Sequence, residues 1–145
     1  MSKFVYKFQS IQKVKESLQK KVQKEIALLD LEIEKLENEF NTVSSEESES
    51  KKKILNKDVL VGEIKFRKNY ELCLDRKKIT ILEKINKLNK KKEIKRLELI
   101  QKSKEHKIFD SLEEVYHENF KKEENRTELK FIDELATQKF IRQTK

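Results

Sequence analysis

The sequence has no proline and no tryptophan, and it has one glycine and one cysteine in 145 residues. A single glycine cannot build a glycine-rich phosphate-binding loop. One cysteine, Cys73, excludes both an intrachain disulfide and a cysteine-based metal cluster, so we interpret it as a small apolar residue on a helix. The two histidines, His106 and His117, are three helical turns apart, which is too far for one metal ion.

Apolar residues are scarce as well. The chain is 35% hydrophobic and 43% charged, whereas compact domains are roughly 45–50% apolar and about 25% charged. Too little apolar material is present to surround a three-dimensional core, and the composition is typical of coiled coils and long helices. Disorder is the competing interpretation. It is disfavoured because Ile, Leu, Val and Phe recur at helical spacing over most of the length.

The sequence contains no long apolar run. No segment approaches the ~20 apolar residues of a membrane span, and the first 13 residues lack the apolar core of a secretory signal. We therefore expect a cytoplasmic protein with no direct membrane insertion. Two long helices also cannot enclose a water-poor pocket, so we expect no enzymatic activity, no catalytic residues and no cofactor or metal.

The net charge of +8 raises nucleic acid or an anionic membrane surface as partners. Most lysines alternate with glutamates, as in the solvated flanks of coiled coils, and the one dense basic cluster covers residues 84–96. We expect no specific nucleic-acid binding, only weak, salt-sensitive attachment.

Two lines of apolar residues predict two helices. The first has alternating steps of four and three residues, which defines a heptad seam: Val22, Ile26, Leu29, Ile33, Leu36, Phe40 and Val43. Upstream, Phe8, Ile11, Lys15 and Leu18 follow the same rule in another phase, so a stutter is expected after Leu18. The second seam is poorer, because Lys92, Lys95 and Lys102 occupy core positions between its members: Leu60, Ile64, Leu74, Ile81, Ile85, Leu88, Leu99, His106, Phe109, Tyr116 and Phe120.

Two segments could hold the reversal between the seams. Residues 42–50 are a polar run of poor helix formers, and residues 56–63 contain the only glycine, Gly62. A bend near residue 60 sets the glutamates of residues 32–39 against the lysines of residues 84–90, which favours the second segment. The prediction is an all-α antiparallel coiled-coil hairpin forming one domain over residues 1–145. Its first helix covers about residues 8–55, its turn about 56–63, and its longer second helix about 64–142.

The two arms of this hairpin are unequal. At ~1.5 Å per residue, the second helix extends tens of ångströms beyond the first. Its last part still carries apolar residues, which must be buried against a partner protein or a second copy.

Three segments resemble the flagellar FliJ protein family. These are KFVYKFQSIQKVKESLQKKVQKEIALL at the start, VLVGEIKFRKNYELCL in the middle and HKIFDSLEEVYHENFKKEENRTELKFIDELATQKFIRQ at the end. The match lies in the order and spacing of common helix residues over most of the chain. The serine- and glutamate-rich run at residues 42–50 departs from the family pattern.

The resemblance implies the central stalk of a hexameric flagellar export ATPase, peripheral to the inner-membrane export apparatus, which it activates. It also implies contact with the export gate protein FlhA and with export chaperones. By the same resemblance, the ATPase ring would contact Leu129, Phe131, Ile132, Asp133, Leu135, Phe140 and Arg142. The gate would contact Phe66, Tyr70, Cys73 and Leu74. Packing inside the hairpin or in a self-association interface is the competing role for both sets.

Other functions remain open at this point. The equivalent stalk of a virulence-type secretion system is hard to separate by sequence. A self-assembling structural coiled coil is a different class, although the poor second seam argues against a long dimer.

Overall fold

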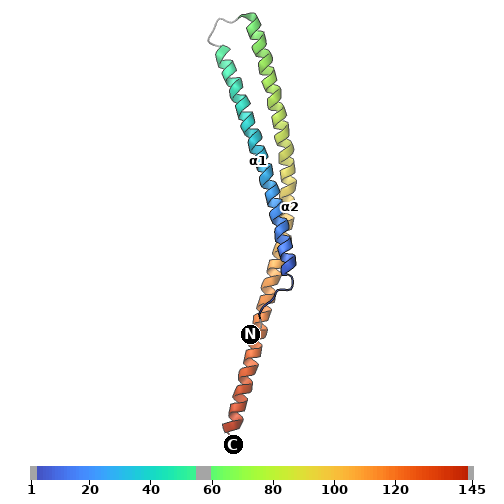
Figure 1. Ribbon diagram of the computed structural model, residues 1–145, viewed down its shortest axis with the longest axis vertical. Helices are drawn as coiled ribbons and strands as arrows, with labels where there is room; N and C mark the ends of the chain where they lie inside the picture. The colour runs from blue at the N-terminus through green and yellow to red at the C-terminus, as the bar shows by residue number, and fades with distance from the viewer. Residues whose placement is uncertain (1–2, 55–59, 144–145) are drawn as a thin grey trace. The chain divides into compact units, whose positions relative to one another are not determined.

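The computed structural model describes residues 3–54 and 60–143, and these form two helices, α1 (Gln9–Ile54) and α2 (Val61–Gln143) (Figure 1). No strand occurs in these residues. The described chain falls into two compact units. The hairpin unit comprises residues 20–100, and the terminal unit comprises residues 3–19 and 101–143. The predicted all-α fold with a longer second helix is confirmed.

In the hairpin unit, α1 and α2 lie side by side and antiparallel (Figure 1). Their core lies where the two predicted seams meet, and Leu74 is its most buried residue at 1% exposure. Leu36, Phe40 and Leu88 pack against the buried set, which consists of Ile33, Val43, Leu74, Ile81 and Ile85. The heptad pattern predicted these contacts because side chains three and four residues apart share one helix face.

Ion pairs between the two helices define their register. Lys95 Nζ lies 2.8 Å from Glu25 Oε2, Lys92 pairs with Asp30, and Lys78 pairs with Glu47. The residue numbers rise along α1 as they fall along α2, as an antiparallel pair requires. The lysines at positions 92 and 95 therefore stand at the seam with acidic partners, which explains how a seam poor in apolar residues is tolerated.

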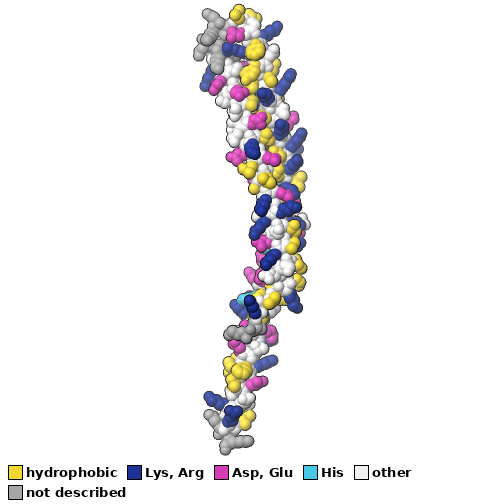
Figure 2. Space-filling view, viewed as in Figure 1, with side chains coloured by type: hydrophobic (Ala, Val, Ile, Leu, Met, Phe, Trp, Pro, Cys, Tyr) yellow, Lys and Arg dark blue, Asp and Glu magenta, His cyan; other side chains and the backbone are white. Residues whose placement is uncertain are grey.

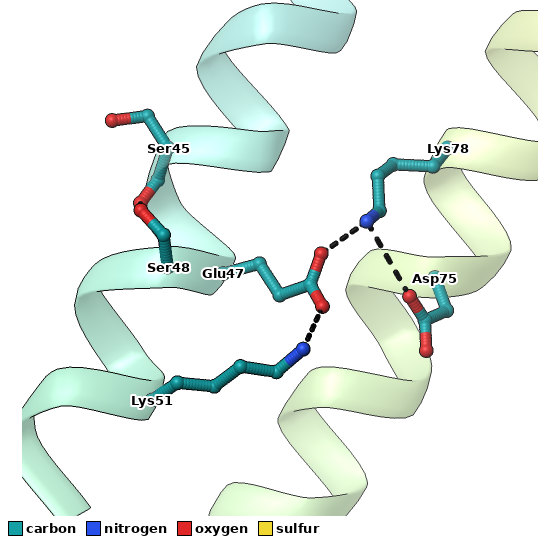
Figure 3. Close-up of polar contacts among 6 residues, drawn as sticks. All are labelled: Ser45, Glu47, Ser48, Lys51, Asp75 and Lys78. Atoms are coloured by element: carbon teal, nitrogen blue, oxygen red, sulfur yellow. Dashed lines mark hydrogen bonds and ion pairs between the residues drawn. The ribbon is translucent and has the colours of Figure 1, made fainter.

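The serine- and glutamate-rich run at residues 42–50 is helical and belongs to α1. Its hydroxyl groups bond the carbonyls of their own helix: Thr42 Oγ1 donates to the Asn38 oxygen at 3.0 Å, and Ser48 Oγ donates to the Ser45 oxygen at 2.8 Å. The Glu47 carboxylate accepts from both Lys51 and Lys78, and Lys78 Nζ also lies 3.6 Å from Asp75 (Figure 3). These bonds hold the run against α2, so the chain does not reverse there.

The other segment considered for the reversal, residues 56–63, lies partly outside the described residues. Of its described part, Leu60 precedes α2, while Val61, Gly62 and Glu63 form the first turn of that helix. The backbone N–H of Glu63 donates to the Leu60 carbonyl at 2.9 Å. The second helix thus begins at Val61, three residues before the predicted start.

Three members of the predicted second seam are exposed: Leu60, Ile64 and Tyr116, although the Tyr116 ring still contacts those of Tyr6 and Phe8. The pairing of Glu47 with Lys78 sets the end of α1, Ile54, opposite Glu71. Leu60 and Ile64 therefore lie on turns beyond the helical residues of α1. Their assignment to the core was wrong because spacing along α2 does not tell where its partner ends.

In the terminal unit, residues 3–8 are not helical and lie along α2. Tyr6 is buried, and its hydroxyl donates to the main-chain oxygen of Phe109 at 2.9 Å. Aromatic rings meet edge to face, at centroid distances of 5.1 Å for Phe4 with His117, 5.5 Å for Phe4 with Phe120, 5.9 Å for Tyr6 with Tyr116 and 6.5 Å for Phe8 with Phe109. This aromatic cluster anchors the N-terminal segment.

The first turns of α1 in the terminal unit face α2 with polar residues. Gln12 Nε2 donates to Asp110 Oδ1 at 2.7 Å and to Glu113 Oε2 at 2.8 Å, and Lys15 Nζ lies 2.7 Å from Glu105 Oε2. Ile11 is exposed, and so is Leu18. The seam therefore runs through Phe8, Gln12, Lys15 and Gln19, in regular steps of four and three. The predicted stutter was wrong, because the apolar Ile11 and Leu18 had been counted as seam members in place of the polar Gln12 and Gln19.

Neither described helix contains a window long and apolar enough to cross a membrane.

Candidate partner-binding surfaces

The last part of α2 lies uncovered in the terminal unit. Phe120 contacts the ring of Phe4. From residue 125 to residue 142 every described side chain is exposed. Figure 2 shows hydrophobic side chains among the charged ones near the C-terminus. This segment, which we call the tail (residues 125–142), contains all seven residues expected to contact an ATPase ring.

The large apolar residues of the tail, except Ile141, gather on one half of the helix. Leu129 and Ile132 are three residues apart and therefore share a face, and Phe131 lies beside Leu135 four residues on. All four are about half exposed or more. Asp133 and Arg142 are exposed on the same tail. An apolar face of this size on a surface indicates a protein-binding site, since water solvates it poorly.

The four residues expected to contact an export gate lie near the start of α2, and the structure divides them. Phe66 is 74% exposed, and Tyr70 and Cys73 are also exposed. Leu74 is instead the most buried residue of the hairpin core. Leu74 is therefore removed from the candidate surface: it lies one residue beyond Cys73, and 100° of helical rotation turns it toward α1.

A polar hollow that the sequence pattern did not reveal lies next to Tyr70. Arg67 and Tyr70 line it from α2, and Glu46, Glu49 and Ser50 line it from α1. Arg67 Nη2 lies 3.5 Å from Glu63, while its buried Nη1 has no hydrogen-bond partner among the described residues. An unsatisfied buried guanidinium nitrogen is costly, so a partner with a carbonyl or carboxylate oxygen would be favoured here.

The basic cluster at residues 84–96 is partly neutralised. Lys92 pairs with Asp30, Lys95 pairs with Glu25 and Glu98, and Arg96 lies 3.7 Å from Glu93. The hydrogen bonds that the Lys95 ammonium donates to Glu25 and Glu98 raise the pKa of Lys95, and the same ammonium lowers the pKa of Glu25. The acidic partners neutralise these basic side chains, so fewer positive charges remain to bind nucleic-acid phosphates.

Lys84 and Lys91 of that cluster belong to a charged flank of the hairpin. Glu39 and Lys84 line one shallow groove, together with Glu46 and Lys77. Glu32 and Lys91 line a second groove. Acidic residues on α1 thus face basic residues on α2 at seven-residue intervals, which supports the antiparallel alignment.

The grooves of the described residues are shallow and open, and these residues include no cluster of three or more metal-ligating side chains. His106 Nδ1 lies 3.0 Å from Asp110, and His117 packs on Phe4. Two surfaces with exposed large apolar side chains therefore stand out in the described residues, one at the tail and one near the start of α2.

The family comparison agrees with this geometry. The model of the family described as flagellar FliJ protein matches residues 3–145. The chain belongs to the FliJ family. A search of curated proteins and a search of solved structures each found no significant match. FliJ membership makes it a stalk protein related to flagellar export, with a structural or regulatory role and an association with the flagellar export apparatus.

Proposed function

We propose that this FliJ protein is the central stalk of the hexameric flagellar export ATPase, which it binds and activates. It acts in the cytoplasm at the inner-membrane export apparatus and has no catalytic activity of its own. The family match to a flagellar model favours this role over the stalk of a virulence-type secretion system.

The tail carries the proposal. It is a helix whose described side chains are all exposed, although Leu129, Phe131, Ile132 and Leu135 are large and apolar. A ring of subunits around a narrow pore can surround a single helix on every side. Contact with such a ring would bury the apolar half of the tail and leave its charged residues for the rim.

The second surface supports the further parts of the proposal. Phe66, Tyr70 and Cys73 are exposed near the start of α2, beside the polar hollow that contains Arg67. We assign contact with the gate protein FlhA to this surface, and the delivery of export chaperones to the same stalk. Exposed aromatic residues next to an arginine are the residue types that dominate binding energy in protein interfaces.

The test uses the full chain and its cognate ATPase. The full chain should co-purify with the ATPase and increase ring assembly and ATP hydrolysis. A chain truncated before Leu129 should lose both effects. Equal recovery of the two chains would move the ring contact away from the tail, and no recovery of either would remove the proposal.

Point variants test whether the apolar surface of the tail, and not merely its helical structure, binds the ATPase. Ile132→Glu places a charge in the apolar half and should reduce ATPase binding by at least about tenfold. Lys130→Glu places the same residue on the opposite half of the helix, where no apolar contact residue lies three or four positions away, and should bind like the unaltered chain. For the gate, Phe66→Glu should weaken binding to FlhA and leave ATPase binding unchanged.

A further inference from the structure

The first part of α2 has a second line of apolar side chains that α1 does not cover. We call it the outer stripe. Figure 2 shows hydrophobic side chains at the surface along this part of the hairpin unit. Its residues are separated by steps of three and four, and all are exposed: Val61, Ile64, Lys68, Leu72, Asp75, Ile79 and Leu82.

The outer stripe differs from the core seam of the same helix. Leu74 and Ile81 are buried against α1, whereas Leu72 and Ile79, two residues before each, are 51% and 57% exposed. A step of two residues turns a side chain by about 200°, so the stripe faces away from α1. Steps of three and four are those of a coiled-coil seam, and no described helix of the hairpin unit lies against this one.

The order of residue types in the stripe reads the same from either end. Two apolar residues and a charged residue precede Leu72, and a charged residue and two apolar residues follow it. When two copies are aligned antiparallel about Leu72, Val61 stands opposite Leu82 and Ile64 stands opposite Ile79. Every apolar residue then meets an apolar residue.

The charges at the two inner positions are complementary in this alignment and not in the parallel, in-register one. Lys68 of one copy meets Asp75 of the other, and the two-fold axis makes this pair twice. In a parallel alignment, Lys68 would meet Lys68 and Asp75 would meet Asp75. The Asp75 carboxylate is 53% exposed. Lys78 lies 3.6 Å away with its ammonium also bound to Glu47, and the charge of Lys51 acts on Asp75 from further off. The Asp75 carboxylate can therefore accept from Lys68.

We propose that the outer stripe binds the outer stripe of a second copy of this chain, antiparallel and with two-fold symmetry. The contact would be isologous, with Leu72 at the axis. It is separate from the tail and from the surface of Phe66, Tyr70 and Cys73, so it does not depend on the proposed stalk function.

The proposed contact is short, so its affinity should be low. Its 22 residues extend about 33 Å at ~1.5 Å per residue, and Lys65 and Arg76 border it with like charge. A small contact with like charges at its rim is expected to be weak and reversible. Dimers should therefore form in the range of tens to hundreds of micromolar.

The test is sedimentation equilibrium of the full chain between 5 and 500 μM at physiological salt, with far-UV circular dichroism to check that each variant is helical. The unaltered chain should show a reversible monomer–dimer equilibrium. Lys68→Asp should raise the dissociation constant roughly tenfold, because it places like charges together at two sites. Asp75→Lys should have the same effect. The double reversal, Lys68→Asp with Asp75→Lys, should restore the dissociation constant to within about threefold.

Further variants locate the contact. Leu72→Glu should abolish the dimer, because the two new charges meet at the axis, and Lys90→Asp outside the stripe should leave it intact. A monomer at every concentration would overturn the proposal, and so would a double reversal that fails to restore dimers. A dimer that survives Leu72→Glu but is lost on truncation before Leu129 would assign self-association to the tail instead. ATPase binding, measured separately, should be the same for Leu72→Glu and the unaltered chain.

Discussion

The hydroxyl of Tyr6 donates a 2.9 Å hydrogen bond to the main-chain oxygen of Phe109, a residue 103 positions further along the chain. This bond and the surrounding rings attach the non-helical N-terminal segment to α2. Burial raises the pKa of Tyr6, and the nearby Glu113 carboxylate raises it further, so the hydroxyl stays protonated and remains a donor.

Tyr6→Phe should keep the ring contacts and remove the hydrogen bond. The Phe109 oxygen already accepts within its helix, so the expected loss is small, a decrease in Tm of roughly 2–4 °C. Tyr6→Ala should also remove the ring contact with Tyr116 and cause a clearly larger decrease. Circular dichroism melting curves measure both, and equal effects of the two variants would contradict the role of the ring.

Leu74→Ala tests the hairpin core. The side chain is 1% exposed, so its truncation should lower the free energy of unfolding by about 2–5 kcal/mol. Urea denaturation followed by circular dichroism gives the value. Leu97→Ala is the matched control on the same helix, because Leu97 is 62% exposed, and its change should stay below about 1 kcal/mol.

The stability of the hairpin unit should fall in acid because of Glu47. Hydrogen bonds from Lys51, and then from Lys78, lower the pKa of this carboxyl from 4.5 to about 2 (Figure 3). A depressed folded-state pKa gives stability that is fully present above pH 4.5 and is lost as the pH falls toward 2. Glu25 and Glu105 have pKa values lowered by Lys95 and Lys15, and they act in the same direction.

Glu47→Gln isolates this contribution. Its Tm should be below that of the unaltered chain at pH 7, and the difference should shrink as the pH falls from 5 to 2. Glu34→Gln is the control, because Glu34 is exposed on α1 and forms no ion pair with the described residues of α2. A constant difference between Glu47→Gln and the unaltered chain over the whole pH range would contradict the assignment.

Gly62→Ala tests where α2 begins. Gly62 lies in the first turn of α2, has no positive φ, and has no heavy atom within 4 Å of the position of an added Cβ. Alanine should therefore raise the free energy of unfolding by roughly 0.5–1 kcal/mol. A decrease would place Gly62 in a turn that needs a left-handed conformation. Urea denaturation at low micromolar concentration gives the sign.

The sequence predicted the hairpin well where apolar residues carry the seam. All seven residues of the first seam, from Val22 to Val43, are buried or partly buried in the structure. Heptad spacing places these residues on one face of the helix. In a chain with so few apolar residues, that face can be buried only against the other helix.

Prediction failed where polar residues occupy the seam. It also failed where burial depends on the residue at which the partner helix ends. Gln12 and Lys15 face α2 because Asp110, Glu113 and Glu105 accept from them, and a count of apolar residues cannot detect such matches. Residues 42–50 have low helix propensity, yet Glu47 attaches them to Lys78. In both cases a contact between residues far apart in sequence outweighed the local pattern.

Of the residues predicted for the candidate surfaces, those in the tail are all exposed, as contact with a partner requires. Leu74, predicted for the surface near the start of α2, is not exposed. Periodicity could not separate Cys73 from Leu74, because both belong to a plausible helix face until the position of α1 is known. The hollow with Arg67 has no sequence signal at all, since it forms only between residues of two helices.

The full exposure of residues 125–142 affects how this segment folds. Its helix continues from turns that are already packed, so no new nucleus has to form. The further turns are stabilised by helix propensity and by local pairs such as Arg126 with Glu123. The amide protons of these turns should therefore exchange with solvent much faster than those around Leu74 and Ile81. Capture by a partner would slow that exchange, and part of the free energy of association would be consumed in suppressing the fraying of the last turns.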